Sequence, residues 1–236
     1  MLCCLPGDEM REKAYLAVKR IFDFLAALAA TLVMLIPWVI IALIIKIQSP
    51  GPAIYKARRV GLHGKTFTLY KFRSMRVDSG KVHATTLKGD SRIFPFGQFL
   101  RNSKLDETPQ LINILKNEMS VIGPRPEDEE NSSKFYTGKY EKILSVKPGL
   151  SSPASLYDYT HGENYPDEES YIREFLKKKL DMEVYYIEHR SLSYDFIVIV
   201  RTVITIVEII FGKEDFQEPV EAQKMMMDSS SVGVRR

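Results

Sequence analysis

Residues 24–45, FLAALAATLVMLIPWVIIALII, form a run of 22 residues without a charged side chain. As a straight helix this run would reach roughly 33 Å, enough to cross the hydrocarbon core of a bilayer. Pro37 divides it into limbs of 13 and 8 residues. These limbs are about 20 and 12 Å long, so neither alone spans a core of ~30 Å. A helix bent at Pro37 would therefore enter the membrane and return to the same side.

Basic side chains on both flanks of this run agree with a re-entrant helix. The positive-inside rule places both flanks in the cytoplasm. Two alternatives stay open, namely a spanning helix with a tolerated proline kink and a buried helix of a soluble core. The flanking cations are Arg11, Lys13, Lys19 and Arg20 before the run, and Lys46, Lys56, Arg58 and Arg59 after it.

A second apolar stretch, residues 192–211 (LSYDFIVIVRTVITIVEIIF), carries five polar residues on an arc of about 140° of a helix. The wide apolar face that remains predicts an amphipathic helix lying in a membrane interface, and an amphipathic helix packed on the protein's own core fits equally well. The polar tail that follows, residues 213–236, is expected to be disordered. The five polar residues are Asp195, Arg201, Thr202, Thr205 and Glu208.

Between the two apolar stretches the pattern predicts a compact domain over residues 49–191. Residues 53–59 and 66–72 read as two strands around a turn at 61–64. Helices are expected over 105–115 and 166–189. The fold class is therefore α+β and mainly α, divided into an N-terminal membrane segment (1–48), this domain, an amphipathic helix (192–212) and a tail (213–236).

The charge is unevenly distributed, although the net charge is only +3. Residues 24–77 contain no acidic side chain, which predicts an anionic surface or ligand here. The aromatic residues around Lys71 and Arg73 would also suit a nucleic acid, but the adjacent apolar run favours lipid phosphate. The basic residues of this segment are Lys46, Lys56, Arg58, Arg59, Lys65, Lys71, Arg73 and Arg76.

Several classes of protein are excluded by composition and motif. A hydrophobic content of 45% excludes a disordered chain. The only cysteines, Cys3 and Cys4, are adjacent, which excludes a disulfide scaffold and leaves free thiols or S-acylation open. The four histidines lack metal-ligand spacing, and neither a Walker loop nor a dinucleotide glycine fingerprint is present.

Asp106 and Glu107 are the sharpest candidates for catalysis, because they stand at the start of an expected helix. Unpaired N–H groups and the helix dipole there favour an ionised carboxylate, which can act as a nucleophile or bind Mg²⁺. Acids in a first helical turn also serve only to stabilise the helix. The surrounding cations, among them Arg101 and Arg125, shift the interpretation towards phosphoryl transfer.

The segment Gly123-Pro124-Arg125-Pro126 presents one arginine between two prolines. Because proline fixes φ on both sides, this rigid loop suits a phosphate clamp, and it is also compatible with a simple turn that exposes an arginine.

Several motifs in this order resemble the bacterial sugar transferase family, the monotopic phosphoglycosyl transferases, over residues 15–212. The chain departs from the family after Lys-Pro-Gly-Leu, where it continues Ser-Ser-Pro-Ala (151–154). The motifs are Lys-Arg-Ile-Phe-Asp-Phe (19–24), Ser-Pro-Gly-Pro (49–52), Tyr-Lys-Phe-Arg-Ser-Met (70–75), Leu-Asp-Glu-Thr-Pro-Gln (105–110), Met-Ser-Val-Ile-Gly-Pro-Arg-Pro (119–126) and Lys-Pro-Gly-Leu (147–150).

The resemblance implies transfer of a sugar-1-phosphate from a nucleotide sugar, usually a UDP-sugar, to undecaprenyl phosphate, with release of UMP. Asp106 would be the nucleophile that forms a phosphosugar intermediate, and Mg²⁺ would bind near Asp106 and Glu107. Arg101 and Arg125 would hold phosphate. Lys71 and Arg73, from the basic segment, are further candidates for binding substrate or phosphate.

The resemblance also implies a place and a set of partners. The enzyme would lie on the cytoplasmic face of the bacterial inner membrane, beginning the assembly of a glycoconjugate such as exopolysaccharide or lipopolysaccharide. No nucleic-acid partner is expected, and a homodimer stays open. The competing hypothesis is a non-catalytic, polybasic peripheral membrane protein, which would explain the apolar run and the basic segment without Asp106.

Overall fold

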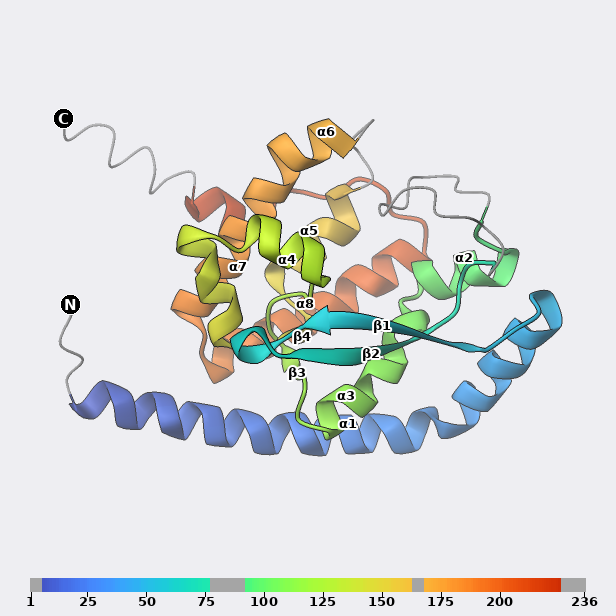
Figure 1. Cartoon of the computed structure of the whole chain (residues 1–236), viewed down its shortest axis with the longest axis horizontal. Coiled ribbons are helices and arrows are strands. Elements are labelled where there is room, and N and C mark those ends of the chain that lie inside the picture. The colour runs from blue at the N-terminus through green and yellow to red at the C-terminus, as the bar shows by residue number, and fades with distance from the viewer. Residues whose placement is uncertain (1–5, 77–91, 163–167, 226–236) are drawn as a thin grey trace.

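The computed structural model describes residues 6–76, 92–162 and 168–225. The first helix, α1 (Pro6–Gln48), runs along one side of the molecule, and the other elements pack on the opposite side (Figure 1). Helix α1 continues through Pro37 without a break in its assigned span. Its C-terminal part turns towards the β-hairpin (Figure 1), so the two limbs predicted from the sequence form one bent helix.

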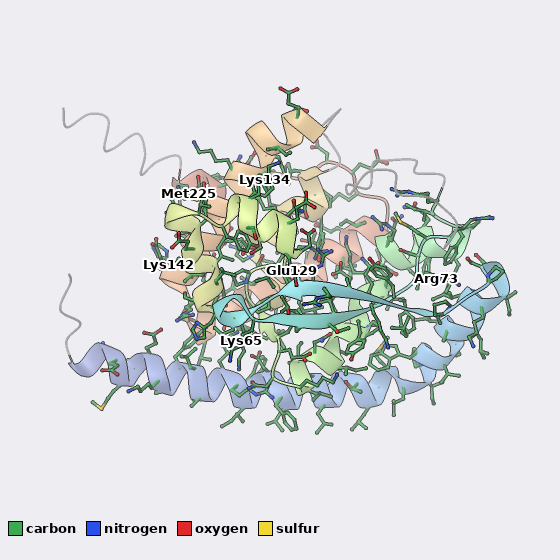
Figure 2. All side chains as sticks on the ribbon, viewed as in Figure 1. Lys65, Arg73, Glu129, Lys134, Lys142 and Met225 are labelled. Carbon is green, nitrogen blue, oxygen red and sulfur yellow. The ribbon has the colours of Figure 1, made fainter. Side chains whose placement is uncertain are left out.

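Helix α1 keeps most of its apolar surface exposed. Its most apolar window of 18 residues has a mean hydropathy of 2.8 and is only 11% buried, and α1 is long and apolar enough to cross a membrane. Figure 2 shows side chains projecting from α1 away from the rest of the molecule. The alternative of a buried helix in a soluble core is therefore wrong.

Polar side chains on the other face of α1 tie it to the domain. The buried Asp23 carboxylate accepts hydrogen bonds from the Ser120 hydroxyl (2.6 Å) and from the Val121 N–H (3.0 Å). Farther along, the Trp38 indole N–H donates to Thr108 Oγ1 at 2.9 Å. These bonds, of which the one between Asp23 and Ser120 is buried, fix the position of α1 against the elements that carry the candidate site.

The predicted hairpin is confirmed. Strands β1 (Ile54–Val60) and β2 (Thr66–Phe72) are antiparallel, with Tyr55 opposite Lys71, and the short 3₁₀ helix η1 (Leu62–Gly64) joins them. Asn113, which is fully buried, locks the hairpin to the next helical segment: its amide donates to Thr68 O at 2.7 Å, and its Oδ1 accepts from Tyr70 N at 3.2 Å.

The helix expected over 105–115 is divided in the structure. It consists of the 3₁₀ helix η2 (Leu105–Gln110) followed by α3 (Leu111–Leu115). A separate helix, α2 (Pro95–Asn102), precedes both. Pro109 has no N–H to donate to the Leu105 carbonyl, which instead accepts from the Thr108 hydroxyl at 2.7 Å. The first turn is therefore tighter than an α-helix.

The remaining elements surround the parallel pair β3 (Ser120–Ile122) and β4 (Gly149–Ser151). The charged helix predicted over 166–189 is confirmed for residues 168–189, where it includes one π-helical stretch. The helices are α4 (Glu129–Phe135), η3 (Gly138–Ser145), α5 (Pro153–His161), α6 (Glu168–Ser170), η5 (Tyr171–Leu176), α7 (Lys177–His189) and α8 (Leu192–Ile210).

Helix α8 turns its polar side towards the protein and its apolar side outwards. Asp195 is buried and accepts hydrogen bonds from Tyr186 (2.6 Å) and Lys19 (2.8 Å), whereas Phe196 and Ile204 are 62% and 52% exposed. Val198 of the same helix is fully buried in the core, so α8 packs on the protein and also exposes an apolar face of the kind found in interfacial helices.

The first part of the tail is packed rather than free, in contrast to the disorder expected for it. Residues 220–225 form a helical turn with Ala222 and Glu221 buried. The Glu221 carboxylate accepts hydrogen bonds from Tyr194 (2.8 Å) and Arg201 (2.6 Å), both on α8. Residues 226–236 lie outside the described part of the chain.

The backbone just after β3, at Gly123, touches the backbone at the start of β4, at Gly149. A Cβ added to Gly149 would lie 2.1 Å from Gly123 N, and the Gly149 N–H donates to Pro124 O at 2.8 Å. We expect Gly149→Ala to lower the free energy of unfolding by about 3 kcal/mol, because the strands must separate. Urea unfolding in detergent checks this.

Gly138→Ala is the control for that prediction. Gly138 has φ +59° and nothing within 4 Å of an added Cβ, so only backbone strain of about 1 kcal/mol should appear. An equal loss of unfolding free energy in the two variants would contradict the crowding at Gly149.

Candidate active site

Asp106 and Glu107 lie in a cavity of about 400 Å³, which is called the Asp106 cavity below. Both carboxylates are buried, with exposed fractions of 1% and 5%. The Lys71 ammonium group, which β2 supplies, lies 2.8 Å from Asp106 Oδ2 and 3.5 Å from Glu107 Oε1. The hairpin and η2 therefore bring together three of the residues that the sequence singled out.

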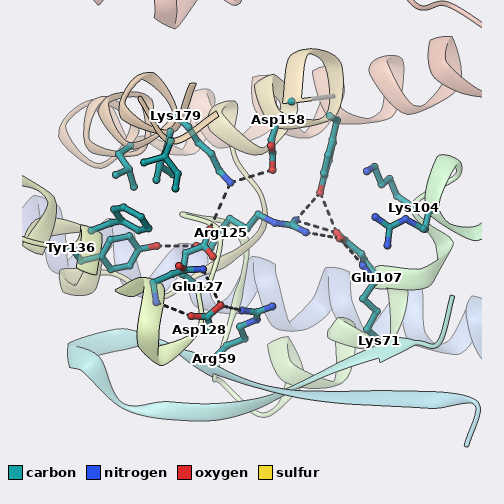
Figure 3. Close-up of a pocket in the computed structure, with 18 of the residues that line it drawn as sticks. Arg59, Lys71, Lys104, Glu107, Arg125, Glu127, Asp128, Tyr136, Asp158 and Lys179 are labelled. Atoms are coloured by element: carbon teal, nitrogen blue, oxygen red, sulfur yellow. Dashed lines mark hydrogen bonds and ion pairs between the residues drawn. The ribbon is translucent and has the colours of Figure 1, made fainter. Parts of the chain in front are cut away.

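Glu107 is held by a dense set of partners (Figure 3). Its Oε1 accepts from Arg125 Nη2 at 2.8 Å, and its Oε2 accepts from the Tyr159 hydroxyl at 3.1 Å. Burial opposes ionisation of Glu107, but the charges of Arg125 and Lys71 outweigh it and hold its pKa well below the usual range. The Glu107 charge in turn raises the pKa of Arg125. Glu107 is thus a permanent anion that positions cations.

Asp106 has far fewer partners than its neighbour. Among the residues that the structure describes, its Oδ1 is buried without a hydrogen-bond partner, and its Oδ2 has only the ion pair with Lys71, in a geometry that does not form a hydrogen bond. A buried carboxylate oxygen left without partners costs free energy, and such costs concentrate at functional sites. Asp106 therefore has an oxygen available to an incoming group.

Arg125 reaches Glu107 from the loop after β3, as the Gly-Pro-Arg-Pro motif predicted. Glu107 and Lys71 lie at one end of the cavity and Tyr136 lies at the other, with the Arg125 guanidinium between them (Figure 3). Nη1 also donates to the Tyr159 hydroxyl at 3.1 Å. Arg125 is thus part of the site rather than an isolated turn residue.

Lys104 was missed by the sequence analysis, although it stands two residues before Asp106. It adopts the left-handed conformation (φ 56°), and its ammonium lies 3.6 Å from the centroid of the Tyr159 ring. Burial lowers the pKa of Lys104, with Arg125 and Lys71 adding to the effect. The only sequence signal for Lys104 was its nearness to Asp106. Tyr159 was also missed, and the sequence carried no signal for it, because it lies 52 residues beyond Glu107.

The other two predicted cations take different positions. Arg101 lines the Asp106 cavity, where its guanidinium makes no ion pair with another described residue. Arg73 is not brought together with Asp106. It is buried, and its guanidinium donates to the carbonyls of Ser49 and Pro50, which tie β2 to the end of α1.

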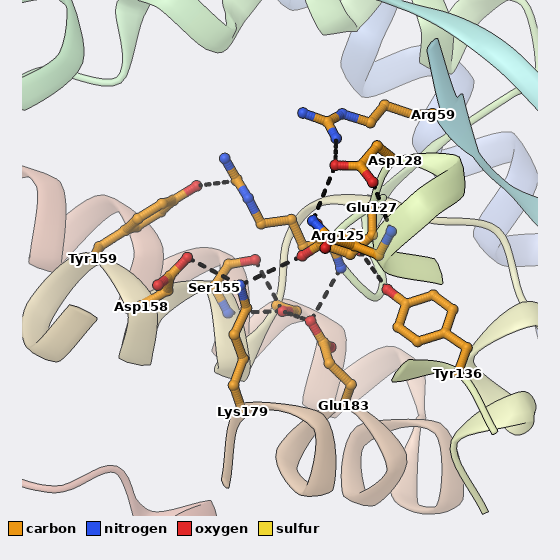
Figure 4. Close-up of polar contacts among 12 residues, drawn as sticks. Arg59, Arg125, Glu127, Asp128, Tyr136, Ser155, Asp158, Tyr159, Lys179 and Glu183 are labelled. Atoms are coloured by element: carbon orange, nitrogen blue, oxygen red, sulfur yellow. Dashed lines mark hydrogen bonds and ion pairs between the residues drawn. The ribbon is translucent and has the colours of Figure 1, made fainter. Parts of the chain in front are cut away.

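A second layer of polar residues supports the Arg125 loop (Figure 4). Glu183 Oε1 accepts from the Arg125 N–H and from the Ser152 hydroxyl, both at 3.0 Å. Lys179 donates to Asp158 at 3.1 Å. The segment Ser151–Ala154 therefore contributes through Ser152, and the helix α5 that follows it places Asp158 and Tyr159 on the cavity wall.

Glu183 makes this layer sensitive to pH. Burial raises the pKa of Glu183 from 4.5 to about 7. The folded protein therefore binds more protons than the unfolded chain between these values, so this carboxylate makes stability fall as pH rises from 4.5 to 7. We expect Glu183→Gln, which keeps an acceptor for the Arg125 N–H, to remove this part of the pH dependence. Melting temperatures of both proteins across this range check the difference, and parallel curves would contradict it.

The arrangement suits chemistry on a phosphate ester. One carboxylate oxygen is available, a second carboxylate is fixed, and several cations surround both. Such a field neutralises phosphate charge in a transition state while leaving a nucleophile free. Among the described residues, no group of three or more His, Cys, Asp or Glu side chains could hold a metal ion.

Comparison with known proteins agrees with this chemistry. Residues 14–209 match the family model described as bacterial sugar transferase. A UDP-glucose:undecaprenyl-phosphate glucose-1-phosphate transferase of Xanthomonas campestris pv. campestris is 34% identical over 85% of the chain and 41% of its own length. A protein of that name in Caulobacter vibrioides is 31% identical over 86% of the chain and 74% of its own length.

A third relative is of similar size to the chain. The exopolysaccharide production protein PSS of Rhizobium leguminosarum bv. phaseoli is 33% identical over 80% of the chain and 95% of its own length. The chain thus spans less than half of the Xanthomonas relative and nearly all of the Rhizobium one. Together with the matched model, these similarities show that the chain belongs to the bacterial sugar transferase family.

Proposed function

We propose that the protein transfers a sugar-1-phosphate from a UDP-sugar to undecaprenyl phosphate, releasing UMP. The names of its relatives supply the substrate classes. The observation that carries the proposal is Asp106, a buried carboxylate with an unpartnered oxygen in a cavity lined by cations.

In the first step, Asp106 Oδ1 attacks the phosphorus that bears the sugar. The bond between this phosphorus and the bridging oxygen breaks, and UMP leaves with the electron pair. The product is an acyl phosphate between Asp106 and the sugar phosphate. Lys71 and Arg125 offset the charge on the phosphoryl oxygens, and Glu107 keeps Arg125 in place.

In the second step, a phosphate oxygen of undecaprenyl phosphate attacks the same phosphorus. The bond from phosphorus to Asp106 breaks and restores the carboxylate, so the product is a lipid-linked sugar diphosphate. The attacking group in each step is an anionic oxygen, so it has no proton to lose. Asp106 therefore has no need of an adjacent general base, and among the described residues lining the cavity there is no histidine.

Mg²⁺ fits this site as a cofactor that binds together with the substrate. Asp106 Oδ2, which forms no hydrogen bond with a described residue, would be a ligand while Oδ1 stays free for attack, and Glu107 stands next to it. Mg²⁺ often binds through one or two carboxylates plus substrate phosphates rather than in a cage of protein ligands. When bound, it would neutralise diphosphate charge and favour departure of UMP.

The membrane arrangement in this proposal is monotopic. The bend of α1 after its basic flank and the outward apolar face of α8 support a re-entrant α1 and an interfacial α8. Both would lie at the cytoplasmic face of the inner membrane, where a nucleotide sugar meets a lipid phosphate.

The test is UMP release by the full chain in nanodiscs, with Mg²⁺, undecaprenyl phosphate and a panel of UDP-sugars. We expect turnover that requires the lipid acceptor and identifies the sugar. Folded, membrane-bound protein without UMP release across the panel would contradict the proposal and favour a non-catalytic lipid-binding role.

A further inference from the structure

A second cavity of about 890 Å³ adjoins the Asp106 cavity and is called the hairpin cavity here. The two cavities share a charged wall formed by Arg59, Lys71, Arg101 and Arg125 with Glu107 and Glu127. Figure 3 shows Lys71 and Arg59 reaching from the hairpin towards the carboxylates near Arg125. A ligand in either cavity can therefore place a phosphate against the same cations.

The two cavities differ in the remainder of their walls. The Asp106 cavity also has the carboxylates of Asp106, Asp128 and Asp158, which suit the hydroxyl groups of a sugar or ribose. The hairpin cavity instead has a set of apolar residues, called its apolar side, and three further cations, Lys56, Arg73 and Arg76. Among the described residues its carboxylates are the two in the shared wall. The apolar side includes Pro52, Ile54, Tyr55, Leu69, Phe72 and Met75.

We infer that the hairpin cavity binds the lipid acceptor, with its phosphate on the shared cations and its first isoprene units along the apolar side. This inference rests on the proposed function. An acceptor of this kind is one phosphate joined to a long apolar chain, which matches a cavity lined by both cations and apolar side chains. The large, polar nucleotide sugar matches the Asp106 cavity.

The position of the hairpin cavity relative to α1 supports the assignment. Pro52 and Ile54 follow the end of α1 at Gln48 by only a few residues. Because α1 is a long apolar helix that is largely exposed, a lipid held beside it would meet the cavity at this end. Arg73 lines the cavity and is bonded to the carbonyls of Ser49 and Pro50, which holds the cavity against α1.

Tyr55 is the side chain that best reports on this site. It is opposite Lys71 in the hairpin register, so both project from the same face, and Lys71 contacts Asp106. The Tyr55 side chain is 55% exposed, and among the described residues its hydroxyl has no hydrogen-bond partner. Tyr55 does not line the Asp106 cavity. An exposed aromatic ring beside the reactive centre is suited to contact an isoprene chain.

The experiment measures the two half-reactions separately in the full chain. UMP released without acceptor reports the first, and lipid-linked product formed after addition of undecaprenyl phosphate reports the second. We expect Tyr55→Ala to raise the KM for undecaprenyl phosphate roughly tenfold and Tyr55→Phe to retain the wild-type value. The KM for the UDP-sugar should stay within about twofold in both variants.

The outcomes separate this inference from the proposed function. Wild-type protein that releases no UMP with donor and acceptor both present would reject the proposed function itself, and UMP release only with both present would reject the covalent first step. With that step intact, an unchanged acceptor KM in Tyr55→Ala, or a raised KM for the UDP-sugar alone, would overturn the acceptor site.

A competition arm distinguishes the polyprenyl phosphate from other lipid phosphates. Phosphatidic acid added to the wild type should inhibit the second half-reaction only weakly. Inhibition at concentrations as low as those at which undecaprenyl phosphate acts would overturn the assignment to the acceptor, because the cavity would then hold any lipid phosphate.

Discussion

Replacing Asp106 with asparagine is expected to lower turnover at least about 10³-fold, because an amide of the same size cannot form the acyl phosphate. The fold should survive. Asparagine fills the same space, and Asp106 Oδ1 has no hydrogen bond with a described residue to lose. Acceptor-dependent UMP release and lipid-linked product measure the loss, and binding to nanodiscs shows that the variant still reaches the membrane.

Glu188→Gln is the matched control. It makes the same change of carboxylate to amide at an exposed position, where Glu188 pairs with Lys142 at 2.9 Å. We expect wild-type turnover from this control. Activity of Asp106→Asn within tenfold of the wild type would show that Asp106 is not the nucleophile.

Arg125→Lys is expected to lower kcat/KM about 100-fold, because lysine keeps the charge but loses the planar fork. Arg125 donates to Glu107 through Nη2 at 2.8 Å and through Nη1 at 3.4 Å, and Nη1 also reaches Tyr159. A lysine ammonium cannot make these contacts from one position. Glu107 would lose its largest cationic partner, so its pKa should rise towards the usual range.

Arg58→Lys makes the same exchange outside the site. The Arg58 side chain is 73% exposed and pairs with Glu129 at 3.0 Å on the surface, where such pairs contribute little. Kinetic measurements should show a loss of kcat/KM in Arg125→Lys and none in Arg58→Lys. Melting temperatures of the two variants check that both are folded. A similar, small effect in the two proteins would contradict the role of Arg125 in the site.

The sequence predicts those parts of the fold that depend on local pattern. The alternation around Gly61–Gly64 predicts the hairpin, and the apolar runs predict α1 and α8, because each pattern is read within one element. The direction of the apolar face of α8 could not be predicted. It depends on the partners of Asp195, which include Lys19 on α1.

The candidate site follows the same division. Asp106, Glu107, Lys71 and Arg125 could be selected because motifs carry them, and the structure brings these four together. Glu183, which supports the Arg125 loop, could not be found, because its contact with the Arg125 backbone joins segments 58 residues apart.

Arg73 shows how a charge pattern leaves the role of a cation open. Its basic neighbours suggested a ligand, but a guanidinium can also serve the backbone. At this position it satisfies carbonyls left open where α1 ends at Gln48. Whether a cation binds a substrate or closes a helix end depends on tertiary contacts that a charge pattern does not contain.

The most direct test of the central claim is the mass of the peptide that contains Asp106 after full-length protein is mixed with the UDP-sugar and Mg²⁺ in the absence of acceptor. The proposed reaction predicts that this peptide gains the mass of one sugar phosphate, that undecaprenyl phosphate removes it, and that Asp106→Asn never gains it. An unmodified Asp106 peptide in protein that releases UMP only when donor and acceptor are both present would contradict a covalent intermediate and indicate direct transfer between the two substrates.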